Sequence, residues 1–319
     1  EAFCRKHGIE QSFGDLESAL EWGEFDAVAN VTPDNAHHPT TLKIAAAGKH
    51  IFCEKPLAVN YAQAEEMTQA AEQARVVAMV NLTYRNVPAL QKARELVRGG
   101  AIGDVIHVEA SYLQSWLSSR YWGDWRTESR WLWRLSKSHG SNGVLGDIGI
   151  HILDFASYGA ASAIENVTCR LKAFPKAPNN QIDEFTLDAN DSFVMAVEFA
   201  NGALGTIHAT RWATGYRDDL QLRIFGTKGG LDVTYGGRDA NGMRIPSLQV
   251  CLNEDVETQT WRHFPLSSVE TNYERFIRAI REGKTLEPSF AHATNLQRIL
   301  DKALEADTAP PGETVVVNT

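Results

Sequence analysis

The chain has 319 residues, of which 43% are hydrophobic and 22% are charged, as in ordinary globular proteins, and this length suffices for two domains. The formal net charge of −9 argues against a nucleic-acid-binding protein, and no apolar stretch is long enough to span a membrane. The four cysteines are scattered without metal-ligand spacing, which favours reduced thiols in a cytoplasmic protein.

Short helices and short strands alternate through the first third of the chain. The sequence predicts helices over residues 15–22, 40–47, 60–74 and 88–97, and strands over residues 26–31, 50–53 and 76–80. Asn60 is placed to cap the third of these helices. Such alternation through short loops predicts βαβ units and a parallel sheet. Residues 1–7 resemble the end of a helix, so we expect the natural protein to have an amino-terminal part that this sequence lacks.

Longer alternating segments follow Gly103. Residues 105–115 alternate as a half-exposed strand does, and Asn201-Gly202 is a strong hairpin turn between strands at 193–199 and 203–210. A second hairpin is predicted over residues 220–235, followed by helices at 268–281 and 291–306 and a strand at 314–317. This half is therefore predicted to be α+β with a largely antiparallel sheet.

Charged residues directly follow the apolar strand at residues 50–53. Glu54 and Lys55 lie at its end, where a charge pair is costly unless it has partners or a function. The segment Thr32-Pro33-Asp34-Asn35-Ala36-His37 directly follows the preceding strand. Because ligands bind beyond the carboxyl ends of parallel strands, we expect both segments to face one crevice. The alternative for residues 32–37 is a proline turn with solvated polar side chains.

Asp147 and His151 are four residues apart, which predicts that they share one face of a helix. A carboxylate beside an imidazole fixes the tautomer of the ring and suits a general base near neutral pH. Two other interpretations stay open. Asp147 could cap the helix while His151 is a hydrogen-bonded core residue, or Asp147, His151 and Asp154 could hold a metal, although no further His or Cys cluster supports this.

Five of the eight tryptophans lie between residues 116 and 134, together with several arginines. Indole faces pack against the C–H surfaces of sugars, and arginines bind hydroxyls or carboxylates. The residues that we expect to bind substrate here are Trp125, Arg126, Trp133 and Arg134. The alternative is a lid or a subunit interface, where tryptophan and arginine are also enriched.

Taken together, these segments resemble the Gfo/Idh/MocA family of NAD(P)-dependent oxidoreductases. The matching motifs are TP-x-x-x-H at residues 32–37, AGKHIFCEKPLA at 47–58, Tyr84-Arg85 followed by Pro88, G-x-I-G at 100–103, D-I-G-x-H-x-x-D at 147–154 and FGTKGG at 225–230. The match covers essentially the whole chain in order. The family's opening strand and G-x-G-x-x-G turn do not occur in this sequence, and we expect them in the missing amino-terminal part.

The resemblance implies an α/β fold of two domains. Residues 1–102 would be a Rossmann-type dinucleotide-binding domain with its first βαβ unit incomplete. Residues 103–319 would be an α+β domain for substrate binding and oligomerisation, with an open, mostly antiparallel sheet. The resemblance also implies a sugar, inositol or related polyol as substrate and a homodimer or homotetramer formed through that sheet. The charge, the apolar stretches and the His and Cys spacing predict no resident metal and no nucleic-acid or membrane partner.

The resemblance further assigns site residues. Lys55, Asp147 and His151 correspond to the family's catalytic lysine, aspartate and histidine, and they would also contact the substrate. The residues expected along bound NAD or NADP are Thr32, Pro33, Asn35, His37, Glu54, Lys55, Tyr84 and Arg85.

These assignments predict the reversible oxidation of a secondary alcohol. His151 would take the hydroxyl proton, Asp147 would orient His151, and Lys55 would stabilise the developing alkoxide. Which of Lys55 and His151 carries the proton varies within the family. Two alternatives stay open, namely a non-catalytic dinucleotide-binding regulator of the same fold and an NAD-dependent glycoside hydrolase.

Overall fold

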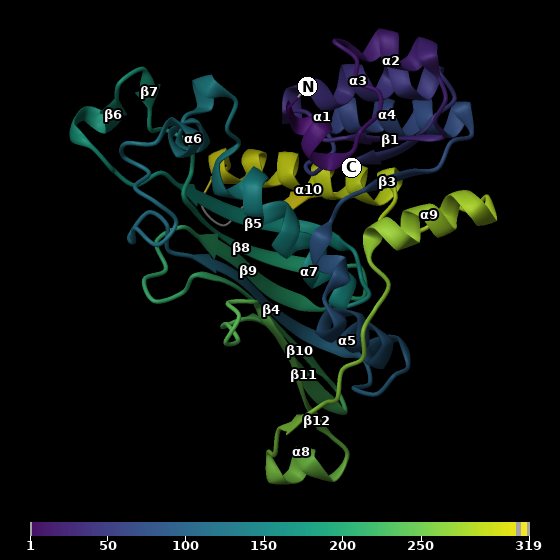
Figure 1. Ribbon diagram of the computed structural model, residues 1–319. Helices are drawn as coiled ribbons and strands as arrows, with labels where there is room; N and C mark the ends of the chain where they lie inside the picture. The colour runs from purple at the N-terminus through teal and green to yellow at the C-terminus, as the bar shows by residue number, and fades with distance from the viewer. Residues whose placement is uncertain (1, 311–313, 318–319) are drawn as a thin grey trace. The chain divides into compact units, whose positions relative to one another are not determined.

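The computed structural model describes residues 2–310 and 314–317, and the chain divides into two compact units (Figure 1). Unit 1 comprises residues 1–81 and 273–294, and unit 2 comprises residues 82–272 and 295–319. This division differs from the predicted boundary after residue 102 because helix α5 (Pro88–Arg98) packs on helix α7 (Ile150–Gly159) within unit 2. None of the helices in the described ranges is long and apolar enough to cross a membrane.

Unit 1 contains the predicted parallel sheet. Strands β1 (Ala27–Asn30), β2 (His50–Cys53) and β3 (Ala78–Val80) pair in that order, and all are parallel. The helices α3 (Asp34–Ala46) and α4 (Tyr61–Ala74) connect them, after α1 (Ala2–His7) and α2 (Leu16–Trp22). The side chain of Asn60 caps α4 by accepting a hydrogen bond from the Gln63 N–H at 3.0 Å, as predicted.

A late helix completes the core of unit 1. Helix α9 (Asn272–Glu282) buries Phe276 and Ala279 against Phe52, Val77 and Met79 of the sheet. This packing explains why residues 273–294 belong to unit 1 although they lie far along the chain.

Helix α3 begins six residues earlier than predicted. The sequence suggested a loop up to Pro39, but the helix starts at Asp34 and contains Pro39 in its second turn. There the missing proline N–H removes one hydrogen bond, and the Thr40 hydroxyl still donates to the Ala36 carbonyl. Asn35 and His37 are therefore helical residues, in a helix that starts soon after β1 ends.

Unit 2 is built on a sheet of nine strands in the order β13-β12-β11-β10-β4-β9-β8-β5-β14. All neighbouring strands are antiparallel except β4 and β9, which are parallel. Both predicted hairpins, β8/β9 and β10/β11, are confirmed. The strands span β4 (Val105–Gln114), β5 (Ile164–Lys172), β8 (Ser192–Phe199), β9 (Leu204–Thr210), β10 (Asp218–Gly226), β11 (Gly229–Gly236), β12 (Ile245–Leu252), β13 (Arg262–His263) and β14 (Val315–Val316).

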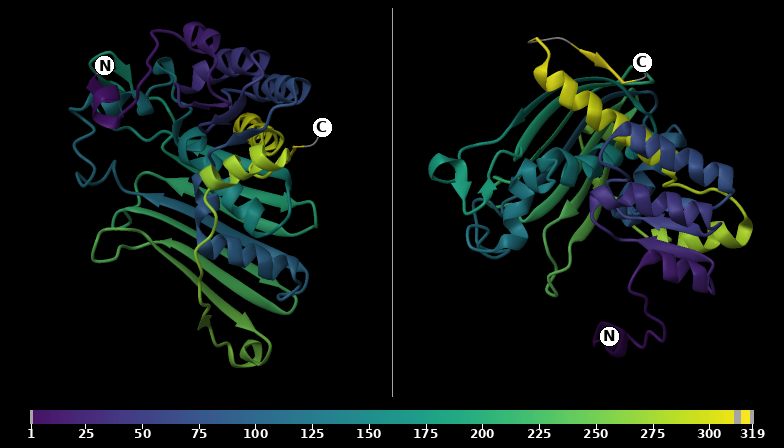
Figure 2. Two further views of the ribbon diagram at one scale, coloured as in Figure 1. Left: turned by 45° about the vertical axis from the view of Figure 1, so that its right-hand side comes forward. Right: turned by 90° about the horizontal axis from the view of Figure 1, so that it is seen from above.

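Within the described residues, the helices that pack on this sheet lie on one of its faces. Helix α7 packs on β4, β9 and β10, and α5 packs on β11 and β12 (Figures 1 and 2). The later turns of α10 (Phe290–Thr308) accept hydrogen bonds from Arg170 of β5. Along β10, Leu220, Leu222 and Ile224 are buried on the helix side, whereas the side chains between them are half-buried. The other face of the sheet is therefore the polar one.

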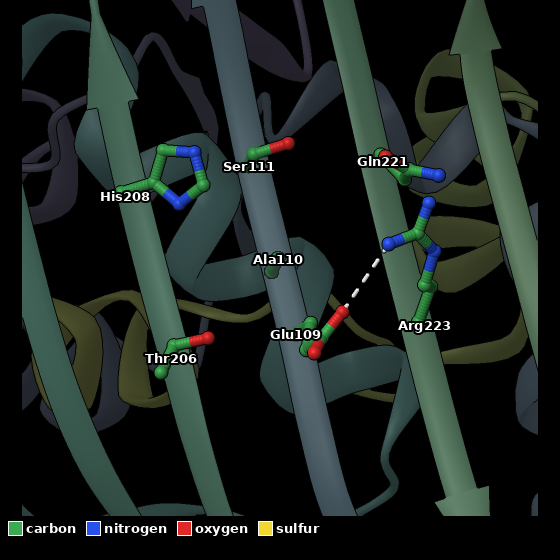
Figure 3. Close-up of a pocket in the computed structure, with 7 residues that line it drawn as sticks. All are labelled: Glu109, Ala110, Ser111, Thr206, His208, Gln221 and Arg223. Atoms are coloured by element: carbon green, nitrogen blue, oxygen red, sulfur yellow. Dashed lines mark hydrogen bonds and ion pairs between the residues drawn. The ribbon is translucent and has the colours of Figure 1, made fainter.

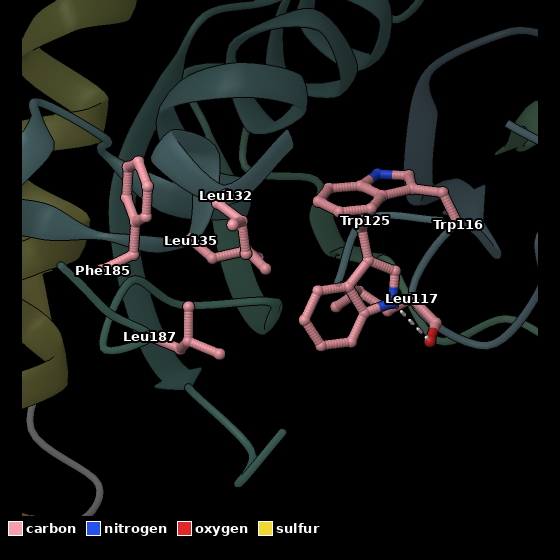
Figure 4. Packing of buried hydrophobic residues seen from close by; sticks show 7 residues of the cluster. All are labelled: Trp116, Leu117, Trp125, Leu132, Leu135, Phe185 and Leu187. Atoms are coloured by element: carbon pink, nitrogen blue, oxygen red, sulfur yellow. Dashed lines mark hydrogen bonds between the residues drawn. The ribbon is translucent and has the colours of Figure 1, made fainter. Parts of the chain in front are cut away.

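Segments that follow β4 and β5 form a small substructure. It consists of α6 (Ser129–Leu132), the 3₁₀ turns η2 (Trp133–Leu135), η3 (Lys137–His139) and η5 (Pro178–Asn180), and the hairpin β6 (Gln181–Ile182)/β7 (Phe185–Thr186). Its own apolar cluster, centred on Trp116 and Trp125, holds it together (Figure 4). The short helix α8 (Glu254–Thr258) lies between β12 and β13.

Candidate active site

Strands β1 and β2 end side by side in unit 1, where Asn30 pairs with Cys53. The buried Asn30 side chain accepts a hydrogen bond from the Thr32 hydroxyl at 2.7 Å and donates to Thr40 Oγ1 at 2.7 Å. Asn30 therefore holds Thr32 at the strand end and ties it to α3. The predicted meeting of residues 32–37 and 54–56 at one edge of the sheet follows from this register.

His37 connects the two segments that follow β1 and β2. Its ring is fully buried, with Nδ1 2.8 Å from the Pro56 carbonyl oxygen and Nε2 2.9 Å from the Thr32 carbonyl oxygen. Both ring nitrogens therefore face the backbone of this chain. This geometry does not support the expected contact of His37 with a cofactor, and it makes His37 a support for Thr32 and for the Lys55-Pro56 segment.

Glu54 has a partner on the next strand. Its Oε1 accepts a hydrogen bond from Asn81 Nδ2 at 2.7 Å, and its Oε2 lies 3.3 Å from the Lys55 backbone N–H. Asn81 directly follows β3 and is buried. The residue at the end of the neighbouring strand therefore holds the Glu54 carboxylate in place. The half-buried Lys55 follows Glu54 and is joined to Pro56 by a cis peptide bond. No motif in the sequence marks Asn81, although it occupies the same edge of the sheet.

In unit 2, Asp147 lies in a π-helical turn, η4 (Leu145–Gly149), that runs directly into α7. The sequence suggested a regular helix here. A Cβ at Gly146 would lie 2.4 Å from the Cβ of Asn142, so this turn requires glycine. Wider turns of this kind occur frequently at functional sites. Gly149, and not Asp147, occupies the capping position of α7.

A buried arginine holds Asp147. Arg211, which directly follows β9, donates from Nη2 to Asp147 Oδ2 at 2.8 Å and from Nη1 to the Arg134 carbonyl oxygen at 3.2 Å. The Asp147 side chain is 34% exposed, whereas that of Arg211 is fully buried. Burial lowers the pKa of the Arg211 guanidinium, and the Asp147 carboxylate opposes this shift. Asp147 is thus an oriented carboxylate with part of its surface open to a ligand.

His151 lies in the first turn of α7 and is buried. Its ring packs against that of Tyr84 with their centroids 4.7 Å apart and their planes at 69°. Tyr84 belongs to the 3₁₀ turn η1 (Thr83–Asn86), and its hydroxyl contacts the hydroxyl of Tyr112 and Arg244 Nη1. The Tyr84 hydroxyl, expected along the cofactor, therefore has partners within unit 2.

Asp154, three residues after His151, forms a buried ion pair. Its two oxygens accept hydrogen bonds from Arg85 Nε at 2.7 Å and Nη2 at 2.6 Å, and both side chains are 2% exposed. The Arg85 guanidinium also lies over the Tyr158 ring. Arg85, which we expected along the cofactor, thus anchors α7 to η1, and Asp154 is occupied by a cation of the chain itself. No group of three or more His, Cys, Asp or Glu residues within the described ranges could hold a metal ion.

The tryptophan-rich segment serves mainly as a core. Trp125 is buried and donates from Nε1 to the Leu117 carbonyl oxygen at 3.2 Å (Figure 4). The structure therefore does not support a substrate-binding indole at Trp125. Arg126 lies on the Trp125 ring and close to Asp124, whereas Trp133 keeps an exposed surface beside Arg134. Arg126, Trp133 and Arg134 are thus among the basic and aromatic groups there that a ligand could reach.

Comparison with known proteins identifies the family. Residues 1–82 match an oxidoreductase family with an NAD-binding Rossmann fold, and residues 90–232 match the GFO/IDH/MocA C-terminal domain. Levoglucosan dehydrogenase of Pseudarthrobacter phenanthrenivorans is 30% identical over 95% of this chain and 83% of that protein. The chain belongs to the Gfo/Idh/MocA family. Another relative, the NAD(+)-dependent scyllo-inositol 2-dehydrogenase of Bacillus subtilis, is 29% identical over 89% of this chain and 76% of its own length.

Solved structures agree with this membership. A crystal structure of an oxidoreductase domain protein from Kribbella flavida has a TM-score of 0.83 and 32% identity, covering 100% of this chain and 87% of that one. Levoglucosan dehydrogenase in complex with NADH and levoglucosan has the same score at 29% identity, with the same coverage of both chains. The predicted Gfo/Idh/MocA fold is therefore confirmed, and the chain is an NAD(P)-dependent oxidoreductase.

The residues at the strand ends of unit 1 fit an NAD(P) cofactor. A hydroxyl (Thr32), a carboxylate (Glu54) and an ammonium (Lys55) are held at the carboxyl ends of parallel strands, where nucleotides bind in such sheets. These groups suit the hydroxyls and the carboxamide of a nicotinamide nucleoside.

Proposed function

We propose that this protein transfers hydride between a secondary alcohol of a sugar, inositol or related polyol and NAD or NADP. The relatives named above act on levoglucosan and scyllo-inositol, and both are polyhydroxylated rings. The observation that carries the proposal is the fixed orientation of Asp147 and His151. Buried Arg211 holds the carboxylate and Tyr84 packs on the imidazole, both within unit 2.

Each polar residue has a distinct role in this proposal. NAD(P), when bound, supplies the acceptor for hydride. His151 takes the proton of the substrate hydroxyl, and Asp147, oriented by Arg211, hydrogen-bonds the imidazole or a neighbouring hydroxyl of the substrate. Lys55 donates a hydrogen bond to the reacting oxygen and stabilises its negative charge. Thr32, Pro33, Asn35 and Glu54 hold the cofactor, and Arg126, Trp133 and Arg134 contact the substrate.

The test is Lys55→Met in the full-length protein. We expect NADH formation from a panel of sugars and inositols to fall by about 100-fold or more, because the reacting oxygen loses its charged donor, while NADH binding is kept. The matched control is Lys43→Met, since Lys43 is an exposed lysine of the same unit that pairs with Glu17. Unchanged turnover in the Lys55 variant would contradict the role of Lys55. Release of an aglycone without net cofactor reduction would contradict the reaction class.

We also propose that two copies pair through the polar face of the sheet in unit 2. A hollow of about 270 Å³ lies on this face. It is lined by the side chains labelled in Figure 3, namely Glu109, Ala110, Ser111, Thr206, His208, Gln221 and Arg223. Arg223 lies 3.3 Å from Glu109 Oε2 and 3.1 Å from Asp232 Oδ2, so acidic and basic groups alternate across the strands. A copy related by a two-fold axis would present complementary charges to this surface.

Exposed apolar residues on the neighbouring strands support this pairing. Val194 of β8 is 61% exposed and Leu204 of β9 is 60% exposed.

The four cysteines are free, and we propose a cytoplasmic location on this ground.

A further inference from the structure

A closed cycle of hydrogen bonds lies behind His151 in unit 2. Tyr112 of β4 donates from its hydroxyl to Asp218 Oδ1 at 2.6 Å, and the Tyr84 hydroxyl contacts that of Tyr112. Arg244, which directly precedes β12, places Nη1 3.2 Å from the Tyr84 hydroxyl and 3.2 Å from Asp218 Oδ2. Four side chains from η1, β4, β10 and the β11–β12 connection thus form one ring.

The chemistry of these groups allows one assignment of donors and acceptors, in which Arg244 donates both to Tyr84 and to Asp218. Arginine only donates and a carboxylate only accepts. Because Tyr112 gives its proton to Asp218, its oxygen accepts from Tyr84, whose oxygen in turn accepts from Arg244. Burial, with the charge of Asp218 adding to it, raises the pKa of Tyr84, and burial raises the pKa of Tyr112 well above its ordinary value. Both hydroxyls therefore keep their protons, and the cycle stays closed at neutral pH.

The cycle reaches His151 through the ring of Tyr84. That ring contacts His151 at 4.7 Å and Tyr235 at 6.0 Å between centroids, in both cases edge to face. Arg244 also lies over the Tyr235 ring, with its guanidinium carbon 4.4 Å from the centroid. Tyr84 is thus held at its hydroxyl by the cycle and packs on Tyr235 through its ring, and its ring lies directly against the imidazole.

We propose that the cycle of Arg244, Tyr84, Tyr112 and Asp218 sets the orientation of the His151 ring, and that Arg244 and Tyr84 are positioning residues of the reaction. This inference rests on the proposed function, because it matters only where His151 takes the substrate proton. A misplacement of about 1 Å in a reacting group lowers rates by about 100-fold, so a rigid support behind the imidazole has a large effect.

Two variants open the cycle at different points. Tyr84→Phe keeps the ring against His151 and removes only the hydroxyl, and Arg244→Met removes the charged donor. We expect kcat to fall by about tenfold in each while KM changes by less than about twofold, because orientation and not substrate binding is lost. Arg244→Lys should restore part of kcat. The controls are Tyr216→Phe, an exposed tyrosine, and Arg238→Met, a half-buried arginine of the same connection that donates to the Gly242 carbonyl oxygen.

The proton NMR signal of His151 tests the inference independently of enzyme activity. We expect the imidazole carbon-bound proton signal of His151, assigned with His151→Gln, to broaden or split in both cycle variants and to stay single in both controls. If the wild-type protein oxidises no polyol, the proposed function fails, and this signal alone decides the inference. Thermal unfolding shows whether each variant folds. If Arg244→Met does not fold, Tyr84→Phe and Arg244→Lys decide whether the inference holds.

Two results would overturn the inference. One is an unchanged kcat together with an unchanged His151 signal in folded Tyr84→Phe. The other is a raised KM at constant kcat, which would mean that these residues bind the substrate and do not orient His151.

Discussion

The fold changes the reactivity of single residues to different degrees, and the four cysteine thiols are the simplest example. Cys53 and Cys169 are buried, whereas Cys4 and Cys251 are half-buried. Burial raises the pKa of Cys53 strongly and that of Cys169 to about 12. Since the thiolate is the reactive form, we expect iodoacetamide at about pH 8 to label Cys4 and Cys251 and to spare the other two until the protein is denatured. Peptide mass spectrometry reads out each site, and early labelling of Cys53 would refute the expectation.

Arg211 allows a second test at this scale. Replacing it with methionine leaves Asp147 without its buried donor, so the carboxylate loses its fixed direction. We expect Arg211→Met to lower kcat by about tenfold or more, measured as the initial rate of NADH formation. Arg262→Met, which breaks an exposed pair with Asp255, should leave kcat unchanged. Equal rates in the two variants would show that Arg211 does not orient a catalytic group.

At the scale of elements, the buried pair of Arg85 and Asp154 joins η1 to α7. Removing one partner leaves a buried charge, so we expect Arg85→Met to lower the free energy of unfolding by about 3–5 kcal/mol. The double variant Arg85→Met/Asp154→Leu should recover much of this loss, because no charge stays buried. Urea unfolding followed by circular dichroism measures both. A double variant no more stable than the single one would argue against an electrostatic origin of the loss.

Elements with local signals were predictable from the sequence. Asn60 caps α4, the run at residues 50–53 is β2, and Asn201-Gly202 joins β8 to β9. The start of α3 was not predictable, because Pro39 usually argues against a helix interior and here occupies its second turn.

The side chains that hold the site residues in place could not be predicted from the sequence for a different reason. Arg211 meets Asp147 from 64 positions away, and Arg244 meets Tyr84 from 160 positions away. No spacing rule joins such pairs, since the order of strands in the sheet determines them. The motif positions Lys55, Asp147 and His151 could be named from the sequence, but their partners could not.

At the scale of the whole molecule, the polar face of the sheet predicts the oligomeric state. Leu204→Glu places a charge on that face at a residue that is already exposed, so we expect the fold to be kept and the oligomer to dissociate toward monomer. Analytical ultracentrifugation measures the mass. Leu304→Glu on α10, which alters an exposed leucine outside the sheet, is the control. An unchanged mass for the Leu204 variant would place the interface elsewhere.

The return of α9 to the sheet of unit 1 limits how this protein can be divided. The chain passes between the units after residues 81, 272 and 294, so neither unit is one continuous stretch of sequence. A fragment that stops before residue 273 would lack Phe276 and Ala279, and it would leave Phe52, Val77 and Met79 without their apolar cover. Replacing one unit with that of a relative therefore requires the two sequences to be joined at all three of these positions. We expect recombination to pass on the cofactor and substrate specificities of such a chain together, as one inherited module.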